Sequence, residues 1–183
     1  MFARPGLPSF DYLRAREPSE VVERLQQHGR EARLLMGGTD LFPSLRDGLL
    51  RPKIIIDVKP VPGMIAVEFN AKDGLSVGAA VTMNQLVSHP IIQDRFPLLA
   101  GAAGSVASYQ IRNRATLGGN LCNASPCADT SPATLILDAR FVLNGPDGER
   151  SLPADEFFLG PGHTAILPGE FMTAIRFPLP PAG

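Results

Sequence analysis

Cysteine is scarce in this chain, and its scarcity excludes several kinds of site. The chain holds Cys122 and Cys127 alone, and the three histidines, His28, His89 and His163, are scattered without ligand spacing. A structural zinc ion or an iron–sulfur cluster normally takes about four ligands of these types. A disulfide is geometrically possible but disfavoured in a reducing cytoplasm. We therefore expect the two cysteines to be small thiols that fill space in a loop and bind no metal.

Long apolar runs and an excess of one charge sign are also missing. No run approaches the roughly 20 apolar residues that a membrane-spanning helix needs, and the first residues lack the apolar segment of a signal peptide. The formal net charge is −1 without a basic cluster, so nucleic-acid binding is not expected. With 44% hydrophobic and 19% charged residues among 183, the sequence predicts a globular cytoplasmic protein with no membrane span.

The common nucleotide-binding and hydrolase motifs are absent as well. There is no G-x-x-x-x-G-K-[ST] phosphate loop, no G-x-G-x-x-G after a strand and no G-x-S-x-G nucleophile turn. The acidic residues are dispersed, and none is paired in a way that indicates general acid–base catalysis. No residue is predicted to be catalytic, so any chemistry would be carried by a cofactor.

Two glycine pairs stand out among the residues that are present. One lies in Leu35-Met-Gly-Gly-Thr-Asp-Leu41, and the other lies in a run from Ile111 to Asp129 with almost no regular periodicity. Glycine has no Cβ, so paired glycines let backbone N–H groups approach a ligand closely. Successive N–H groups facing one concavity bind anions such as phosphate. Either pair alone is more simply a tight turn, but together they predict two loops that hold a dinucleotide pyrophosphate.

The pattern of apolar and turn residues predicts a mixed α+β protein. Strands are expected at 10–12, 32–36, 53–58, 64–69, 75–78, 140–144 and 170–177, and helices at 20–28 after an N-cap at Ser19, 43–47, 82–90 with a capping box, 97–107 and 131–137 with Ser131 as N-cap. The early elements read as a βαβ-like lobe, residues 1–58, and the later ones as a second α+β lobe with an antiparallel sheet, residues 59–183. Two apolar stripes are expected to face the core: Val21, Val22 and Leu25, and Leu135 with Ile136.

The two glycine motifs closely resemble the FAD-pyrophosphate motifs of the flavoprotein (medium) subunits of molybdenum hydroxylases. This family includes the flavin subunits of aerobic carbon monoxide dehydrogenase, xanthine dehydrogenase and 4-hydroxybenzoyl-CoA reductase. The matching segments follow the family's order: Phe10-x-Tyr12, Leu35-Met-Gly-Gly-Thr-Asp-Leu-Phe-Pro43, Arg51-Pro52, Ile111-Arg-Asn-Arg114, Thr116-Leu-Gly-Gly-Asn120, Ala124-Ser-Pro126, Phe157-Phe158 and Pro168-Gly-Glu170. The resemblance covers nearly the whole chain. It implies the two-lobed FAD-binding fold shared with vanillyl-alcohol oxidase and the peptidoglycan precursor reductase, with FAD between the lobes.

The resemblance also implies roles for individual residues. The pyrophosphate would be cradled, largely through backbone N–H groups, by Leu35, Met36, Gly37, Gly38, Thr39, Asp40 and Leu41 and by Thr116, Leu117, Gly118, Gly119 and Asn120. Val106 would pack near the cofactor, and Ile166 would lie against the isoalloxazine, although a core strand residue would look the same. Asp129 would bond a ribityl or ribose hydroxyl, or would instead supply the N-terminal charge of the helix that follows. Arg112 and Arg114 would face phosphate or a partner subunit, with solvated surface as the simpler alternative.

The family's activity depends on several subunits. A molybdopterin-containing large subunit oxidises the substrate, and a small subunit with two [2Fe–2S] clusters relays electrons to FAD, which passes them to NAD⁺ or another acceptor. The resemblance therefore implies an FAD-dependent oxidoreductase subunit that is inactive alone. Two other interpretations stay open: a stand-alone flavin reductase of the peptidoglycan-precursor type, and a flavin-free interaction domain that retains the scaffold.

Two departures from the family pattern are expected. The family usually continues beyond residues 178–183 into a C-terminal domain of roughly a hundred residues, a typical domain size, and that domain is absent from this sequence. The 4-hydroxybenzoyl-CoA reductase branch carries a cysteine-rich insertion for an extra cluster, and the short segment from Cys122 to Cys127 has no room for it.

Overall fold

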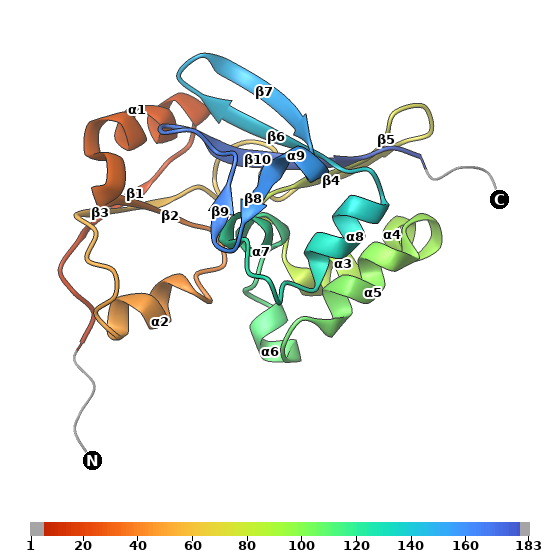
Figure 1. Cartoon of the computed structure of the whole chain (residues 1–183), viewed down its shortest axis with the longest axis horizontal. Coiled ribbons are helices and arrows are strands. Elements are labelled where there is room, and N and C mark those ends of the chain that lie inside the picture. Colours follow the sequence, from red (N-terminus) through yellow and green to blue (C-terminus); the bar gives the residue numbers. More distant parts are fainter. Residues whose placement is uncertain (1–5, 180–183) are drawn as a thin grey trace.

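The computed structural model describes residues 6–179, which form two main sheets with helices packed around them (Figure 1). In chain order the elements are β1 (Asp11–Arg14), α1 (Pro18–His28), the 3-10 turn η1 (Gly29–Glu31), β2 (Ala32–Leu35), α2 (Leu41–Arg46), β3 (Ile54–Asp57), β4 (Val67–Asn70), β5 (Gly74–Gly78), α3 (Met83–Ser88), α4 (Pro90–Arg95), α5 (Pro97–Ser105), α6 (Tyr109–Arg112), α7 (Leu117–Asn123), α8 (Thr130–Ile136), β6 (Arg140–Gly145), β7 (Gly148–Pro153), α9 (Ala154–Phe157), β8 (Phe158–Gly160), β9 (His163–Thr164) and β10 (Phe171–Phe177).

The first sheet is parallel and has the strand order β1-β3-β2. Its central strand β3 is buried along its whole length, as the continuous apolar run predicts. Side chains alternate between the two faces of a strand. Ile54 and Ile56 accordingly join the main core together with Val21 of α1, whereas Ile55 packs with Leu45 of α2 on the opposite face. Strands β1 and β2 thus flank a buried strand whose two faces are covered by different helices.

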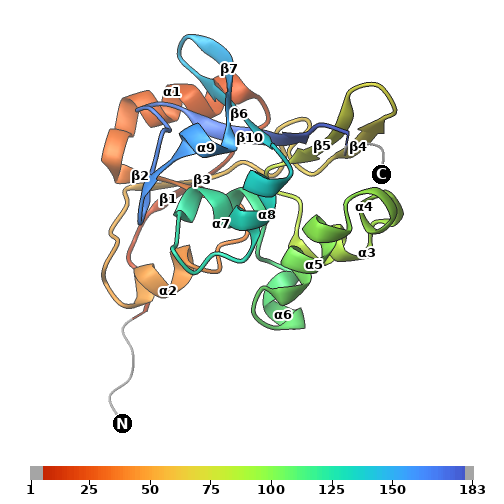
Figure 2. The same ribbon diagram turned by 45° about the vertical axis from the view of Figure 1, so that its right-hand side comes forward.

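The second sheet is antiparallel and has the order β4-β5-β10-β6-β7. The expected β4–β5 hairpin is present. A second hairpin joins β6 to β7: Gly145 pairs with Gly148, and Pro146 and Asp147 form the turn between them. Strands β8 and β9 form a separate two-stranded ribbon. Figures 1 and 2 place α3 to α8 on one side of the five-stranded sheet.

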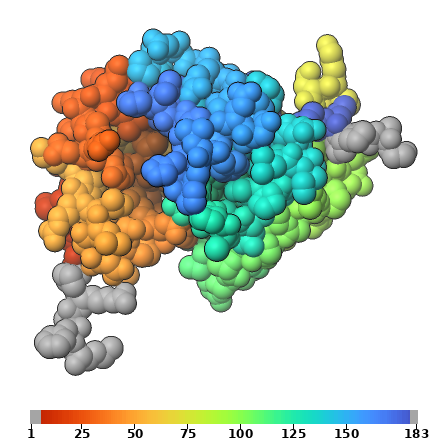
Figure 3. All heavy atoms as spheres, in the orientation of Figure 1, coloured from red at the N-terminus to blue at the C-terminus, as the bar shows by residue number. Residues whose placement is uncertain are grey.

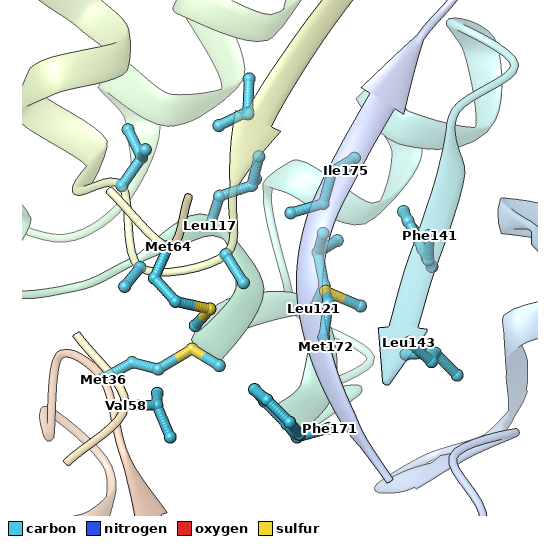
Figure 4. Close-up of a cluster of buried hydrophobic side chains, with 14 of the residues drawn as sticks. Met36, Val58, Met64, Leu117, Leu121, Phe141, Leu143, Phe171, Met172 and Ile175 are labelled. Atoms are coloured by element: carbon cyan, nitrogen blue, oxygen red, sulfur yellow. The ribbon is translucent and has the colours of Figure 1, made fainter. Parts of the chain in front are cut away.

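One continuous core lies under both sheets. Met36 and Val58, which follow β2 and β3, pack in the same cluster as Leu121 of α7 and Met172 of β10 (Figure 4). Edge-to-face aromatic pairs extend this core beside β6, where the ring centroids of Phe141 and Phe157 are 4.6 Å apart. The structure is therefore mixed α+β, as expected, with a shared interior that joins the two sheets.

Two helix starts differ from the prediction. Helix α1 begins at Pro18 with Glu17 as its N-cap, not Ser19, and the carboxylate of Glu20 accepts the backbone N–H of Arg16 at 2.8 Å. Proline is favoured in a first turn because its missing N–H would have no partner there. Helix α8 likewise begins before Ser131, with Asp129 at the N-cap position.

The expected orientation of α8 is wrong. Leu135 and Ile136 are 42% and 69% exposed instead of facing the core. The buried positions include Thr130 and Thr134, whose hydroxyls donate to Asn120 Oδ1 and to the Ser131 carbonyl. Because these hydroxyls are satisfied locally, threonine can take the inner face. The other predicted stripe is confirmed, since Val21 and Val22 are buried and Leu25, which is partly buried, packs against the main core.

The run from residue 111 to 129, expected to be irregular, contains short helices. Helices α6 and α7 are four and seven residues long, and they begin after N-caps at Ser108 and Thr116. Helices this short do not span enough turns to show a period of 3.6 residues in the sequence. The second glycine pair therefore lies in the first turn of a helix.

Among the helices of residues 6–179, none combines the length and the apolar composition that crossing a bilayer requires.

Candidate functional site

A cleft of about 660 Å³ separates the β2–α2 segment from α6, α7 and the start of β10. In Figure 3 the orange surface around α2 lies on one side of it and the green and teal surface around α6 and α7 on the other. The structure brings most of the expected site residues to this cleft: Met36, Gly37, Gly38, Thr39, Asp40, Leu41, Val106, Thr116, Gly119, Asn120 and Ile166. Both glycine motifs thus meet at one concavity.

Four expected residues do not line the cleft. Leu35 packs with the α2 cluster, and Leu117 is fully buried in the main core. Gly118 packs against Ala79 on the side away from the cleft. Asp129 is exposed at the N-cap of α8, which is the position that the alternative interpretation of its charge requires.

The first glycine motif supplies free backbone donors. It follows the carboxyl end of β2, where open α/β sheets bind their ligands. Within the described part of the chain, the N–H groups of Gly37, Gly38, Thr39 and Asp40 donate no hydrogen bond to protein atoms. Gly38 has φ +78°, a conformation that glycine adopts without strain. Unpaired donors of successive residues are what an anion site needs.

An ion network centred on the buried carboxylate of Asp57 supports this motif. Asp57, at the end of β3, is 4% exposed; its carboxylate accepts the Tyr12 hydroxyl at 2.7 Å and pairs with Lys59 Nζ at 2.6 Å. The same ammonium donates to the Met36 carbonyl at 3.2 Å. Burial alone raises the pKa of Asp57, but the hydrogen bonds from Lys59 and Tyr12 outweigh it, so this pKa lies below its ordinary value. The network ties β1 and β3 to the peptide that precedes the glycine pair.

The second glycine motif contributes close packing more than free donors. The N–H groups of Leu117 and Gly118 donate to the carbonyls of Val81 at 3.0 Å and Ala79 at 2.9 Å. The N–H group of Gly119 donates to Thr116 Oγ1 at 3.2 Å as part of the N-cap. The N–H group of Asn120 donates to the Thr116 carbonyl at 3.0 Å. The backbone donors of Leu117, Gly118, Gly119 and Asn120 are therefore all taken up by the protein, which leaves the Thr116 and Asn120 side chains at the cleft.

Arg112 organises another wall of the cleft. Its Nη1 donates to the carbonyls of Val106 at 3.0 Å and Ala107 at 3.2 Å, and its Nε donates to Asn84 Oδ1 at 3.2 Å. Ala107 has φ +43°, a conformation that costs a non-glycine residue energy. Arg112 is half-buried, so it holds a strained turn that lines the cleft; Arg114 is exposed to solvent.

The loop that carries Ile166 also lines the cleft. The Arg150 guanidinium pairs with the Glu170 carboxylate through Nε at 2.6 Å and Nη2 at 2.8 Å. The hydrogen bond from Arg150, together with that from the Leu167 N–H group, outweighs the effect of burial and lowers the pKa of Glu170. Phe171 and Met172 at the start of β10 make this part of the lining apolar.

Sequence reasoning missed about half of the cleft lining. The missed residues are Arg33, Leu34, Ser44, Leu50, Ala107, Ile111, Ala115, Cys122, Asn123, Glu170, Phe171 and Met172. Ile111 and Glu170 lie within quoted motifs, and six other missed residues directly border one, so the motif borders were a usable signal for these eight; the six are Leu34, Ser44, Leu50, Ala115, Asn123 and Phe171. The remainder come from core-type strands and helix ends whose approach depends on tertiary packing, and no local pattern marks them.

The two cysteines differ in their surroundings. Burial raises the pKa of Cys122 to about 12, and this residue lies at the edge of the cleft, whereas Cys127 is exposed. Among residues 6–179, no group of three or more histidine, cysteine or acidic side chains is placed to hold a metal ion.

The arrangement fits FAD. A volume of about 660 Å³ lies within the range of roughly 300–1,000 Å³ usual for small-molecule sites. Free N–H groups at the first glycine motif suit a pyrophosphate. Val106, Ile166 and Phe171 supply apolar walls at which a flat ring system can be buried. A ligand that is anionic in its middle and apolar at one end matches this distribution.

The comparisons with known proteins agree with this interpretation. A family profile described as "FAD binding domain in molybdopterin dehydrogenase" matches residues 8–180. The chain is 38% identical to the carbon monoxide dehydrogenase medium chain of Hydrogenophaga pseudoflava, over 93% of this chain and 59% of that protein. It is 35% identical to the xanthine dehydrogenase FAD-binding subunit of Escherichia coli O157:H7, over 93% of this chain and 58% of that protein.

Solved structures give the same result. The fold matches carbon monoxide dehydrogenase from Hydrogenophaga pseudoflava with a TM-score of 0.93 and 37% identity, covering 98% of this chain and 62% of that one. It matches quinoline 2-oxidoreductase from Pseudomonas putida 86 with a TM-score of 0.91 and 30% identity, covering 97% and 61%. The chain thus spans about three fifths of the length of these relatives. By sequence and by structure, this protein belongs to the family of FAD-binding domains of molybdopterin dehydrogenases.

Proposed function

We propose that this chain is the FAD-binding electron-transfer part of a molybdenum hydroxylase. When bound, FAD supplies the capacity to take electrons from the [2Fe–2S] clusters of a partner subunit and to pass them to NAD⁺ or another acceptor. The observation that carries the proposal is the cleft itself, in which the free N–H groups of Gly37 to Asp40 lie opposite an apolar end that contains Ile166. The parallel and antiparallel sheets would correspond to two lobes, residues 1–58 and 59–183.

In this proposal the chain's own residues bind and orient the cofactor. The backbone of Gly37 to Asp40 donates to the pyrophosphate, and the side chains of Thr116 and Asn120 add polar contacts from the second motif. Val106 and Ile166 exclude water from the ring system. Three motif residues do not line the cleft but fix the backbone of the two motifs through their packing: Leu35, Leu117 and Gly118.

Among the described residues, the cleft lining carries an acidic side chain beside the loop of Ile166. Glu170 is the acidic side chain there, and its carboxylate is held ionised by Arg150. A stand-alone flavin reductase needs a serine or an acid to protonate its substrate, and an ionised Glu170 does not serve as that acid.

Binding of FAD by the purified chain tests the proposal directly. The chain should bind FAD more tightly than FMN, because two glycine motifs suit a pyrophosphate and have little use for a single terminal phosphate. Gly119→Val would place a branched side chain in the cleft lining, 2.8 Å from Thr116 Oγ1 at its Cβ, so FAD binding should be lost. The far-ultraviolet circular dichroism should stay that of the parent, with a lower melting temperature because the N-cap of α7 is crowded. Equal affinities for FMN and FAD would contradict the assignment.

The partners are the second part of the proposal. We infer assembly in the cytoplasm with a molybdopterin-containing large subunit and a small subunit that carries two [2Fe–2S] clusters. Purification of the native protein from its source should recover both partners, and substrate oxidation should require them. Recovery of a substrate-reducing enzyme made of this chain alone would favour the flavin reductase instead.

A further inference from the structure

The ion pair of Arg150 and Glu170 forms hydrogen bonds with the peptide groups on both sides of Ile166. Arg150 Nη2 donates to the carbonyl of Ala165 at 2.7 Å, and Glu170 Oε2 accepts the N–H of Leu167 at 2.7 Å. These are the carbonyl that precedes Ile166 and the N–H that follows it. Since Arg150 and Glu170 also hold each other through two short hydrogen bonds, the four contacts close a ring around the Ile166 backbone.

The pair is built into the sheet and is not a loose surface contact. Arg150 lies on β7, and the Glu170 side chain is 8% exposed at the entry to β10. Gly145, at the end of β6, leaves the space for it, because a Cβ at residue 145 would lie 2.6 Å from Glu170 Cγ. A bidentate arginine–carboxylate pair fixes direction as well as distance. The Arg150–Glu170 pair therefore fixes the position of Ile166, which lies in an irregular loop, relative to three strands of the five-stranded sheet.

We propose that Arg150 and Glu170 are positioning residues that set how closely Ile166 packs against the flavin ring. This inference rests on the proposed FAD site. Neither residue takes up electrons or protons in the reaction; although Glu170 also lines the cleft, both residues act through the position of Ile166. A side chain that must meet a planar ring at van der Waals distance needs rigid support, because small displacements remove most of the contact.

The test is a double-mutant cycle on FAD binding by the full chain. Glu170→Gln removes the charge while keeping the shape, and it should weaken FAD binding about tenfold and shift the visible absorption band of bound flavin. In an Ile166→Ala background the same substitution should change the affinity and the band little further, because the group being positioned is gone. Glu149→Gln, which alters the exposed Arg176 pair with its 3.4 Å contact, is the matched control and should bind FAD like the parent.

The outcomes separate this inference from the proposed function. A parent chain that binds no FAD overturns the proposed function and this inference with it. A parent that binds FAD, with Glu170→Gln equal to it or with fully additive effects of Glu170→Gln and Ile166→Ala, overturns the positioning role alone. If Glu170→Gln does not fold, Arg150→Lys provides the same cycle: it keeps the charge but loses the two-pronged geometry, and it should show the same coupling to Ile166.

Discussion

Gly37 packs directly against the backbone carbonyl of Arg114, so closely that a Cβ at residue 37 would overlap the Arg114 oxygen. The contact joins the loop after β2 to the peptide that leads into Thr116. The first glycine of the first motif therefore serves to bring the two motifs together, and the second, Gly38, supplies the left-handed turn.

Gly37→Ala should abolish FAD binding and destabilise the fold. The added methyl group would push the two motifs apart, and an overpacked contact of this kind costs about 1–3 kcal/mol. Thermal melting and FAD titration measure the two effects. Gly101→Ala is the control, because a Cβ at residue 101 of α5 meets open space, and this variant should melt at or above the parent temperature. An unaffected Gly37→Ala variant would disprove the contact's role.

Gly118→Ala should act on stability first. A Cβ at residue 118 would lie 2.6 Å from Ala79 Cβ and 2.7 Å from the Ala79 carbonyl oxygen, on the side away from the cleft. We expect a loss of about 1–3 kcal/mol in urea unfolding. The folded fraction should still bind FAD, because residue 118 does not line the site. Loss of FAD binding with unchanged stability would instead show that residue 118 contacts the ligand.

Stability should depend on the ionisation of Asp57. Its pKa is lower in the folded protein than in the unfolded chain, so its contribution is fully present above the unfolded pKa and is lost as the pH falls through the folded pKa. Asp57→Asn should therefore cost about 1–3 kcal/mol at pH 7 and progressively less below about pH 4. Urea unfolding over this pH range measures the difference.

The control for this pH series is Asp94→Asn. Asp94 forms an exposed pair with Arg95, and its side chain is 70% exposed, so the substitution should change the unfolding free energy little at any pH. A cost of Asp57→Asn that stayed constant with pH would mean that the carboxylate charge is not what stabilises the network.

The two thiols should differ in reactivity. The raised pKa of Cys122 leaves almost no thiolate at pH 8. Iodoacetamide should therefore label Cys127 in the native protein and both residues in urea, as peptide mass spectrometry would show. In Cys127→Ser the native protein should stay unlabelled; rapid native labelling of that variant would contradict the assignment.

Local patterns predicted the parts of the fold that local physics determines. The buried strand at residues 54–57 and the capping box after Thr82 were both visible in the sequence and are both confirmed. The approach of Gly37 to Arg114 was not predictable in this way, because it joins residues far apart in the chain. Thr134 bonds within its own helix, but the burial of Thr130 depends on Asn120 of α7, a partner that the helix itself does not carry.

The same limit applies to the site. Glycine pairs indicated where backbone could approach a ligand, and both pairs reach the cleft. The sequence could not show that the N–H groups of Leu117 and Gly118 are already bonded to Val81 and Ala79. The first motif keeps free N–H groups and the second does not, because α7 packs against the residues that follow β5.

The central place of β10 bears on the order in which the chain can fold. Strands β4 to β7 are synthesised before β10, yet β5 and β6 lie on either side of it in the sheet. Until residues 171–177 have been made, two hairpins carry open edges whose backbone groups can pair with other chains. Pairing of such distant segments is slow. The nascent protein thus passes through an aggregation-prone stage that ends when one late strand enters between two early hairpins.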